Sequence, residues 1–441
     1  MMEQSSAEEK VNRAFLVGIR DEKLSKKEAD SLVRELEGLV NTLGLEIAGR
    51  ELVNVREKSA RYGMGTGKAE ELAQKAASLG ADCIIFDREI SPSQQRNWEE
   101  LSGISVIDRQ ELIIQIFAGR AHTREAELQV NLAELVYALP RLQHKYINLS
   151  RQRGGRYGTR GSGETFLETD RRRLEQRIHR LEEELEDVKR QRQVQRKQRE
   201  RNNVPVCALV GYTNAGKSSI LNVLTGAGVL AEDKLFATLD STSRRLELPR
   251  GTQVLLVDTV GFIRRLPHSL INAFRSTLEE VSRADLLLNV LDASDPDAHA
   301  QYETTLSVLR ELDAENIPMI TVLNKIDLLE TPLETPLETP PGDRVSLEAL
   351  LKLYPGGVPV CAADSRTGGP RGLEELCARI EDAVSKALIR FRFPAGRTDL
   401  AALLHRTGQV VSEKYGDSFI EMEARTDDRT AGRLKEYQVN E

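Results

Sequence analysis

The segment GYTNAGKS at residues 211–218 is the feature that most constrains how this chain can fold. An apolar run, VPVCALV, comes directly before it, and SILNVL continues after it with a helical pattern. This order of strand, glycine-containing loop and helix, with GxxxxGK[ST] spacing, is typical of a phosphate-binding loop in an α/β protein. Gly211 and Gly216 permit the tight path of a backbone whose N–H groups surround phosphates. Lys217 is expected to contact the outer two phosphates, and the Ser218 hydroxyl is expected to bind Mg²⁺.

Two further segments follow in the order that a nucleotide switch requires. DTVG at 258–261 ends the apolar strand VLLV, which places Asp258 near the metal and the Gly261 amide near the terminal phosphate. Thr238, in LFATLD, is the candidate switch threonine that completes the metal coordination. The candidate catalytic residues are Lys217, Thr238 and Gly261, and the candidate metal ligands are Ser218 and Thr238.

The segment MITVLNKID at 319–327 predicts which base is bound. A carboxylate at Asp327 can accept two N–H donors from the Watson–Crick edge of guanine, whereas adenine would leave it unpaired. The stem of Lys325 can lie over the base, and Asn324 can connect this loop to the phosphate loop. VPVCAADS resembles a strand-end loop whose amide near Ala362 meets the guanine oxygen. The predicted GTP and GDP contacts are Gly211, Tyr212, Thr213, Asn214, Ala215, Gly216, Lys217, Ser218, Ser219, Asp258, Gly261, Asn324, Lys325, Asp327, Cys361 and Ala362.

Phe262 follows directly after DTVG, where many switch GTPases have a glutamine that orients the attacking water. A phenyl ring cannot orient water. We therefore predict that the chain alone hydrolyses GTP slowly, and that the backbone, a switch rearrangement or a partner positions the water. The alternative interpretation of Phe262, as packed apolar surface, leads to the same slow rate.

Alternating apolar and helical segments from Phe15 to about Ala118 predict a small parallel α/β domain. The strand candidates are FLVGI, LEIAG, CIIF and ISVI, and Ser91 followed by Pro92 predicts a helix over 91–102. GMGTGK at 63–68 resembles a phosphate loop but lacks its spacing. We interpret this segment as a flexible glycine turn, with a second nucleotide site as the alternative.

Two apolar seams predict an antiparallel helical hairpin after the first domain. Apolar residues recur at steps of four and three in both segments, which is the a/d pattern of a coiled coil. Thr165 and Glu168 can form a capping box that begins the second helix. The first seam is Leu128, Leu132, Leu135, Leu139 and Leu142, and the second is Leu174, Ile178, Leu181, Leu185 and Val188.

The connection between the two seams, RQRGGRYGTRGSG at 151–163, is too rich in glycine to be helical. A flexible backbone that carries guanidinium groups and no acid suits an irregular, phosphate-rich surface. A solvated linker is the alternative, and the basic run at 189–201 is likewise either a basic face or a solvated helix end. The arginines of the connection are Arg151, Arg153, Arg156 and Arg160.

Length and composition exclude several classes of protein. The 441 residues suggest about three domains. The chain lacks an apolar stretch near the ~18 residues of a membrane span, and its polar first residues do not resemble a targeting signal, so we expect a cytoplasmic protein. The four cysteines have no ligand spacing, which argues against structural zinc and disulfides. The net charge of −7 conceals the local basic segments, so RNA remains a possible partner.

The remaining segments complete the expected organisation of the chain. TPLETPLETPP at 331–341 is a short repeat that we interpret as a disordered surface insertion, and a small α+β segment follows Phe391. We expect an N-terminal α/β domain (1–122), a helical hairpin with a glycine- and arginine-rich loop (123–202), a GTP-binding domain with an insertion at about 330–343 (203–388), and a C-terminal α+β domain (389–441).

Over about residues 10–390 the chain resembles the HflX family of ribosome-associated GTPases. The segments that carry the resemblance are RGSGETFLETDRR, LFATLDSTSR and DTVGFIRRLPHSLINAFRSTLEE, at 160–172, 235–244 and 258–280. Small departures occur at Ser162 and Ser241, where the family usually has proline, at Phe166, where it usually has glutamine, and at Cys361, where it usually has serine.

The resemblance implies a Mg²⁺-dependent GTPase that binds the large ribosomal subunit through its N-terminal domain and hairpin loop. The four loop arginines would then be candidate contacts with rRNA. It also implies a role in splitting stalled ribosomes or in large-subunit maturation. We expect a monomer with no DNA partner, and the apolar seams leave open whether they pair within the chain or between chains. Two other functions stay open: an RNA-binding or RNA-remodelling protein with secondary nucleotide turnover, and a signalling GTPase at a membrane, for which the sequence shows no lipid anchor.

Overall fold

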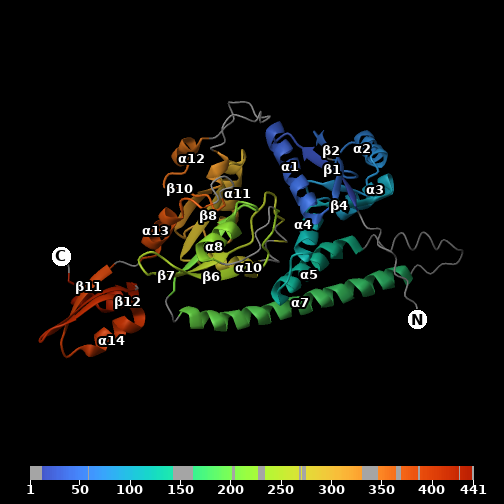
Figure 1. Ribbon diagram of the computed structural model, residues 1–441. Coiled ribbons are helices and arrows are strands. Elements are labelled where there is room, and N and C mark those ends of the chain that lie inside the picture. Colours follow the sequence, from blue (N-terminus) through green and yellow to red (C-terminus); the bar gives the residue numbers. More distant parts are fainter. Residues whose placement is uncertain are drawn as a thin grey trace.

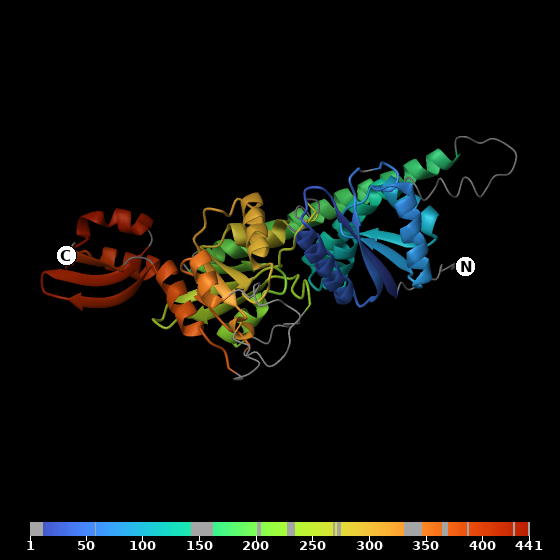
Figure 2. The same ribbon diagram turned by 90° about the horizontal axis from the view of Figure 1, so that it is seen from above.

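The computed structural model describes residues 12–57, 59–142, 162–200, 204–226, 234–267, 270, 275–329, 346–363, 369–385, 388–426 and 428–439. Three β-sheets follow one another along an elongated molecule, and the long helix α7 runs beside the first two (Figures 1 and 2). The loop arginines of 151–160 and the insertion expected at about 330–343 lie outside the described residues. Within the described part of the chain, no helix is long and apolar enough to cross a bilayer.

The N-terminal sheet is parallel and has the strand order β2-β1-β3-β4, which confirms the predicted parallel α/β fold. Its central strands are apolar on both faces, so each face needs a covering of helices. Helices α1 and α4 pack on one face, and α2 and α3 pack on the other. The strands are β1 (Arg13–Arg20), β2 (Glu46–Asn54), β3 (Cys83–Phe86) and β4 (Ser105–Asp108), and the helices are α1 (Lys26–Leu43), α2 (Thr66–Ser78), α3 (Pro92–Ser102) and α4 (Arg109–Ala118).

Local capping signals determine where these helices begin. Ser91 caps α3 and forms a capping box with Gln94, which confirms the helix predicted from Ser91 and Pro92. Ser25 and Glu28 form the same arrangement at the start of α1, and Gly44 ends that helix in the left-handed conformation, with φ of 83°.

The segment GMGTGK leads into α2, and its lysine is occupied by carboxylates. Gly65 is the N-cap of α2. Lys68 Nζ lies 2.5 Å from a Glu51 carboxylate oxygen and 2.7 Å from one of Glu71. A lysine held by two acids is a poor phosphate ligand, so the structure favours the interpretation of this segment as a turn.

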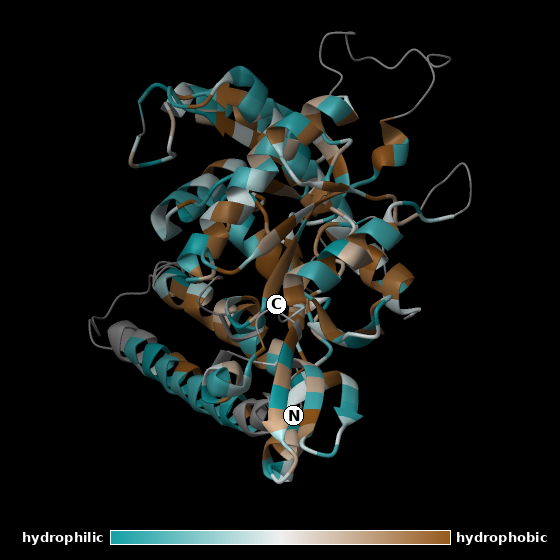
Figure 3. Cartoon of the chain, turned by 90° about the vertical axis from the view of Figure 1, so that its left-hand side faces the viewer, coloured by the Kyte–Doolittle hydropathy of each residue, from teal (hydrophilic) through white to brown (hydrophobic). Residues whose placement is uncertain are grey.

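The predicted hairpin consists of α5 (Arg124–Ala138) and α7 (Ser162–Glu200). Leu128, near the start of α5, packs against Leu181 and Leu185 in the later part of α7, and the two helices are antiparallel (Figure 1). An ion pair of 2.6 Å between Arg124 and Glu184 adds a polar contact at the same end. The α7 helix is largely hydrophilic outside this contact (Figure 3).

Two details of the predicted hairpin are wrong. Helix α5 ends at Ala138 and continues as the short 3-10 helix η1 (Leu139–Arg141), so the first seam does not extend through Leu142 as one α-helix. Pro140 explains this end, because proline has no backbone N–H to donate to the carbonyl four residues earlier, and its ring clashes with that carbonyl. Helix α7 begins at Ser162, three residues before the expected cap, so Thr165 lies inside the helix.

The nucleotide-binding sheet has the strand order β10-β9-β8-β5-β7-β6, in which only β6 is antiparallel to its neighbour among the described strands. Its central strands are strongly apolar (Figure 3) and are covered by helices on both sides. The strands are β5 (Val206–Gly211), β6 (Thr242–Glu247), β7 (Gln253–Asp258), β8 (Leu286–Asp292), β9 (Met319–Asn324) and β10 (Val358–Pro359). The helices are α8 (Lys217–Thr225), α10 (Arg275–Ser282), α11 (Ala298–Glu311), η2 (Ile326–Leu328), α12 (Leu347–Leu353) and α13 (Leu373–Val384).

The C-terminal sheet is antiparallel with the order β11-β13-β12, and it lies at the opposite end of the molecule from the N-terminal sheet (Figure 2). Helix α14 packs on one face of this sheet around Leu404 and Met422. This arrangement agrees with the expected small α+β segment. Its elements are β11 (Leu388–Pro394), α14 (Thr398–Thr407), β12 (Gly408–Tyr415), β13 (Phe419–Thr426), α15 (Asp428–Arg433) and η3 (Lys435–Tyr437).

Candidate functional site

The phosphate loop connects β5 to α8, and two glycines permit its path. Gly211 has φ of 135° and Gly216 has φ of 95°, which L side chains rarely adopt. A Cβ atom at Gly211 would lie 2.2 Å from the carbonyl oxygen of Val290, and one at Gly216 would lie 2.1 Å from Asn324 Nδ2. Both positions therefore exclude a side chain for two independent reasons, positive φ and contact with a neighbouring strand end.

Lys217 is buried at the first position of α8 and is held by the loop itself. Its Nζ donates to the Tyr212 carbonyl oxygen at 2.8 Å and lies 3.3 Å from that of Gly211. Burial lowers the pKa of Lys217 to about 8, and the nearby Asp258 opposes this shift. A bound phosphate would place a negative charge beside the buried ammonium group and would favour its protonated form.

Three oxygen-bearing side chains meet beside the loop and fit a magnesium site. Ser218 Oγ lies 2.8 Å from Thr238 Oγ1 and donates to Asp258 Oδ2 at 2.6 Å. The other carboxylate oxygen of Asp258 is buried and has no hydrogen-bond partner among the described residues. Burial also raises the pKa of Asp258. Hydroxyl and carboxylate oxygens are ligands that Mg²⁺ prefers, and a divalent cation would satisfy the buried carboxylate.

Removing the Ser218 hydroxyl should weaken this metal site. We expect Ser218→Ala to need at least about tenfold more Mg²⁺ for half-maximal GTP turnover, the range typical of losing one supporting group at a metal. Titration of turnover against Mg²⁺ measures the effect. Thr225→Ala, which removes a hydroxyl bonded only within α8, is the control. An unchanged Mg²⁺ requirement in Ser218→Ala would contradict the assignment of this ligand.

The segment after β7 is attached to the phosphate loop through its backbone. Phe262 N–H donates to the Gly211 carbonyl at 3.1 Å, and Thr213 N–H donates to the Phe262 carbonyl at 2.8 Å. Gly261 is required here, because a Cβ atom would lie 2.7 Å from Thr213 Cα. The Phe262 ring is 1% exposed and belongs to an apolar cluster with Leu278, which agrees with its interpretation as a packed apolar residue.

The base-recognition loop is joined to the phosphate loop as the sequence predicts. Asn324 Nδ2 donates to the Ala215 carbonyl at 2.9 Å, and Asn324 Oδ1 accepts from Ala362 N–H at 3.3 Å. The Ala362 amide, predicted to meet guanine, is therefore bonded to Asn324 in this structure. Lys325 adopts a positive φ of 63°, and its Nζ lies 2.6 Å from Asp292.

Asp327 has a hydrogen-bond donor that the sequence argument did not use. Cys361 Sγ donates to Asp327 Oδ1 at 3.1 Å, and both side chains are buried. The thiol thus orients the carboxylate that is expected to read guanine. The only sequence signal for this contact is the cysteine at a position where the family usually has serine.

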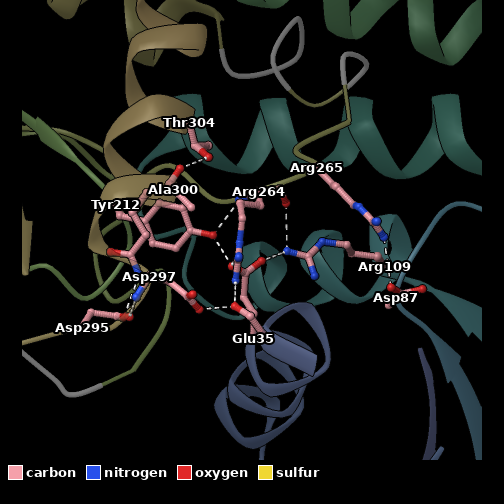
Figure 4. Close-up of polar contacts among 12 residues, drawn as sticks. Glu35, Asp87, Arg109, Tyr212, Arg264, Arg265, Asp295, Asp297, Ala300 and Thr304 are labelled. Carbon is pink, nitrogen blue, oxygen red and sulfur yellow. Dashed lines mark hydrogen bonds and ion pairs between the residues drawn. The ribbon is translucent and has the colours of Figure 1, made fainter. Parts of the chain in front are cut away.

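A second set of residues, which sequence reasoning missed, joins the phosphate loop to helix α1 (Figure 4). The Glu35 carboxylate accepts hydrogen bonds from the Tyr212 hydroxyl, from Arg109 and, at 3.0 Å, from Arg264 Nε. The backbone N–H of Arg264 also donates to the Tyr212 hydroxyl oxygen at 2.8 Å. The side chains of Glu35 and Arg109 are 6% and 1% exposed, so these charges are paired inside the protein. Burial and the Glu35 charge raise the pKa of Tyr212 well above its ordinary value, which keeps the hydroxyl protonated.

Other contacts attach the segment around Thr238 (235–244) and the segment that follows β7 (259–265), which we call the two switch segments, to the N-terminal sheet and its helices. Arg265 pairs with the buried Asp87 at 3.0 Å (Figure 4). In the segment after the phosphate loop, Phe236 packs edge-on against Phe117 of α4, with ring centroids 4.7 Å apart. Asp240 accepts from the Thr123 backbone N–H at 3.2 Å, at the start of α5. The residues beside the predicted phosphate site are therefore in contact with the part of the chain that carries the helical hairpin.

The fold and this site define a P-loop GTPase. Family models give the same result along the chain: "GTP-binding GTPase N-terminal" matches residues 30–118, "GTP-binding GTPase Middle Region" matches 120–199, and "50S ribosome-binding GTPase" matches 206–325. The chain belongs to the HflX family of GTPases, as its resemblance predicted, and it is accordingly an enzyme that binds and hydrolyses GTP.

Two HflX proteins of similar sequence support this assignment. The GTPase HflX of Akkermansia muciniphila is 47% identical over 432 residues, which cover 96% of each chain. The GTPase HflX of Escherichia coli (strain K12) is 47% identical over 298 residues, which cover 68% of this chain and 70% of that protein. A solved GTP-binding protein from Sulfolobus solfataricus, in complex with GDP, aligns over 85% of this chain and 98% of its own, with 23% identity and a TM-score of 0.42.

Proposed function

We propose that this GTPase binds the large ribosomal subunit, hydrolyses GTP slowly alone and faster on ribosomes, and splits stalled ribosomes or acts in large-subunit maturation. The observation that carries the proposal is the attachment of the switch segment at Asp240 to the first turn of α5. A change in the switch on GTP hydrolysis would thereby reach the helical hairpin, whose connecting loop carries four arginines. The "50S ribosome-binding GTPase" description of the matching model for 206–325 supports the same partner.

The slow basal rate follows from the surroundings of Phe262. Its ring is packed in an apolar cluster, and its backbone N–H and C=O are bonded to the phosphate loop. No group at this position can orient water in the way a glutamine does. A large ribosomal particle that rearranges the switch would supply the missing orientation, which explains the stimulation that we propose.

The remaining assignments complete the proposal. Mg²⁺ would be held by Ser218 and Thr238 with Asp258 nearby, and it would neutralise charge on the outer phosphates. We propose that the chain acts as a cytoplasmic monomer and divides into domains at 1–122, 123–202, 203–388 and 389–441. In this division the N-terminal domain and hairpin contact rRNA, and the third domain binds the nucleotide.

Cosedimentation is the test of this function. The full chain should pellet with large subunits more strongly in the presence of a non-hydrolysable GTP analogue than with GDP. Addition of large subunits or whole ribosomes should also raise the rate of GTP hydrolysis. Pelleting with lipid vesicles, or a fast basal rate that ribosomes leave unchanged, would contradict the proposal. Binding to free RNA with no response to nucleotide would favour the RNA-remodelling alternative.

The loop arginines should contribute to attachment and not to basal turnover. We expect the triple variant Arg153→Glu, Arg156→Glu and Arg160→Glu to bind ribosomes weakly and with a flatter salt dependence, because like charges then face rRNA phosphates. Ribosome stimulation of GTP hydrolysis should fall, while the basal rate is unchanged because these residues lie outside the phosphate loop. Cosedimentation at several salt concentrations measures the effect.

A variant with the same change of charge separates this contact from a general electrostatic effect. Arg406→Glu, Lys414→Glu and Lys435→Glu reverse three exposed cations of the C-terminal α+β segment, which the proposal does not place on rRNA. This control should bind ribosomes more strongly than the arginine variant. Equal binding and stimulation by the arginine variant and the unmodified chain, with folding confirmed by circular dichroism, would show that the loop is only a spacer.

A further inference from the structure

The hydroxyl group of Thr213, in the middle of the phosphate loop, is buried and unpaired. The residue is 5% exposed, and its Oγ1 atom has no hydrogen-bond partner among the described residues. Most buried side-chain polar groups in native proteins are paired, so an unpaired one calls for an explanation. This hydroxyl would gain a partner if a water molecule or a ligand entered the site beside it.

Thr213 lines the cavity of about 50 Å³ that also contains Lys217 and Gly261. A Cβ atom at Gly261 would lie 2.8 Å from Thr213 Cγ2 and 2.9 Å from Lys217 Nζ, so the three residues meet at one point. Lys217 is expected to contact the outer two phosphates, and the Gly261 amide is expected to lie near the terminal one. The Thr213 side chain therefore lies beside the predicted position of the terminal phosphate.

The backbone of Thr213 is fixed at this place, while its side chain can still rotate. Its N–H donates to the Phe262 carbonyl oxygen at 2.8 Å, which joins it to the segment that follows Gly261. The Thr213 methyl group, and not the hydroxyl, is the group closest to Gly261 in this structure. A rotation about χ1 by one staggered step brings the hydroxyl to the place of the methyl group.

We propose that Thr213 is a catalytic residue whose hydroxyl oxygen accepts a hydrogen bond from the water that attacks the terminal phosphate of GTP, and thereby orients that water. In this reaction the water oxygen bonds to the γ-phosphorus, and the bond from that phosphorus to the β–γ bridging oxygen breaks. The electron pair of the broken bond stays on GDP, and the water protons leave with inorganic phosphate or pass to solvent. Thr213 keeps its own proton throughout.

The surroundings of Phe262 favour this role over that of a phosphate ligand. Lys217 and the Gly261 amide already face the outer phosphates, whereas the position after Gly261 holds a packed phenyl ring in place of a water-orienting glutamine. A single hydroxyl oxygen accepts from only one O–H bond of the water, and it must first rotate toward Gly261. Both features agree with a slow basal rate. The inference needs only the GTPase activity of the family and does not depend on ribosome binding.

Single-turnover hydrolysis by the full chain tests this role. Thr213→Val keeps the shape of the side chain and removes the hydroxyl. We expect its rate constant to fall by about three- to tenfold, the loss of one hydrogen bond in the transition state. Affinity for GDP and for a non-hydrolysable GTP analogue should change by less than about twofold, because the interaction is made with the water and not with the nucleotide.

Two further variants separate the hydroxyl from the packing of the side chain. Thr213→Ser keeps the hydroxyl and removes the methyl group, so it should retain most of the rate. Thr213→Ala lacks the hydroxyl and is smaller, and it should be slowed by the same factor as Thr213→Val. Thermal melting and GDP affinity report whether the phosphate loop of each variant is intact.

Thr305→Val is the matched control, because it also removes a buried threonine hydroxyl, one that donates to the Gln301 carbonyl within α11 at 3.0 Å. Its rate and affinities should equal those of the unmodified chain. An unchanged rate in Thr213→Val, or equal slowing of Thr213→Ser and Thr213→Val, would overturn the proposal. A parallel loss of affinity for the GTP analogue would assign the hydroxyl to the terminal phosphate and would also overturn the water-orienting role.

Discussion

Replacement of Asp327 by asparagine is expected to change the base preference of this enzyme from guanine to xanthine. The Asp327 carboxylate can accept both N–H donors of guanine, whereas an asparagine amide offers one acceptor and one donor. Xanthine has an oxygen where guanine has its amino group, so it matches the amide. Because a site built around hydrogen bonds rejects a mismatched partner by about 10⁴–10⁵-fold, we expect GTP affinity to fall by several orders of magnitude.

Competition between GTP and xanthosine triphosphate for the variant measures this change. Asp327→Ala is the control, because it removes the carboxylate without supplying a donor and should bind both nucleotides weakly. The orientation of the side chain at position 327 also matters, and in this structure the Cys361 thiol donates to Asp327 Oδ1 at 3.1 Å. An amide oxygen can accept the same bond, so the asparagine should keep its orientation. A variant that retains the original preference for GTP would show that the base is read elsewhere.

The nucleotide-binding part of the fold was predictable because its determinants are local in sequence. Gly211 and Gly216 bracket a loop whose path only residues without a Cβ can follow. Asn324 was expected to join the base loop to the phosphate loop, and it donates to the Ala215 carbonyl at 2.9 Å. In each case a short motif following a buried strand determines both the backbone and the position of the side chain.

The contacts between α1 and the phosphate loop were not predictable in the same way. Glu35 and Tyr212 are 177 residues apart, and nothing in the amphipathic pattern of α1 distinguishes Glu35 from the exposed charges of that helix. Their roles come from how the N-terminal sheet is placed on the nucleotide-binding sheet, which no local motif encodes. The misplaced start of α7 has a different origin, because the capping signal at Thr165 and Glu168 is only local and the helix extends beyond it to Ser162.

Removal of the Lys217 charge is the other change from which we expect a large effect. The ammonium group is buried beside the phosphate cavity and is held by the Tyr212 and Gly211 carbonyls. Losing one partner of a buried charge pair costs about 2–5 kcal/mol, a factor of about 30 to several thousand in affinity. We therefore expect Lys217→Ala to bind GDP and GTP at least about 30-fold more weakly, by isothermal titration.

The same lysine should make nucleotide binding depend on pH. Burial lowers the pKa of Lys217 to about 8, whereas a bound phosphate favours the charged form and raises that pKa again. GDP affinity should therefore be greatest below pH 8 and fall above it, approaching about tenfold per pH unit if one proton is taken up on binding. Titrations in buffers of different ionisation enthalpy report that proton directly. Lys217→Ala should show no proton uptake near pH 8, and equal uptake by the variant and the unmodified chain would assign the proton to another group.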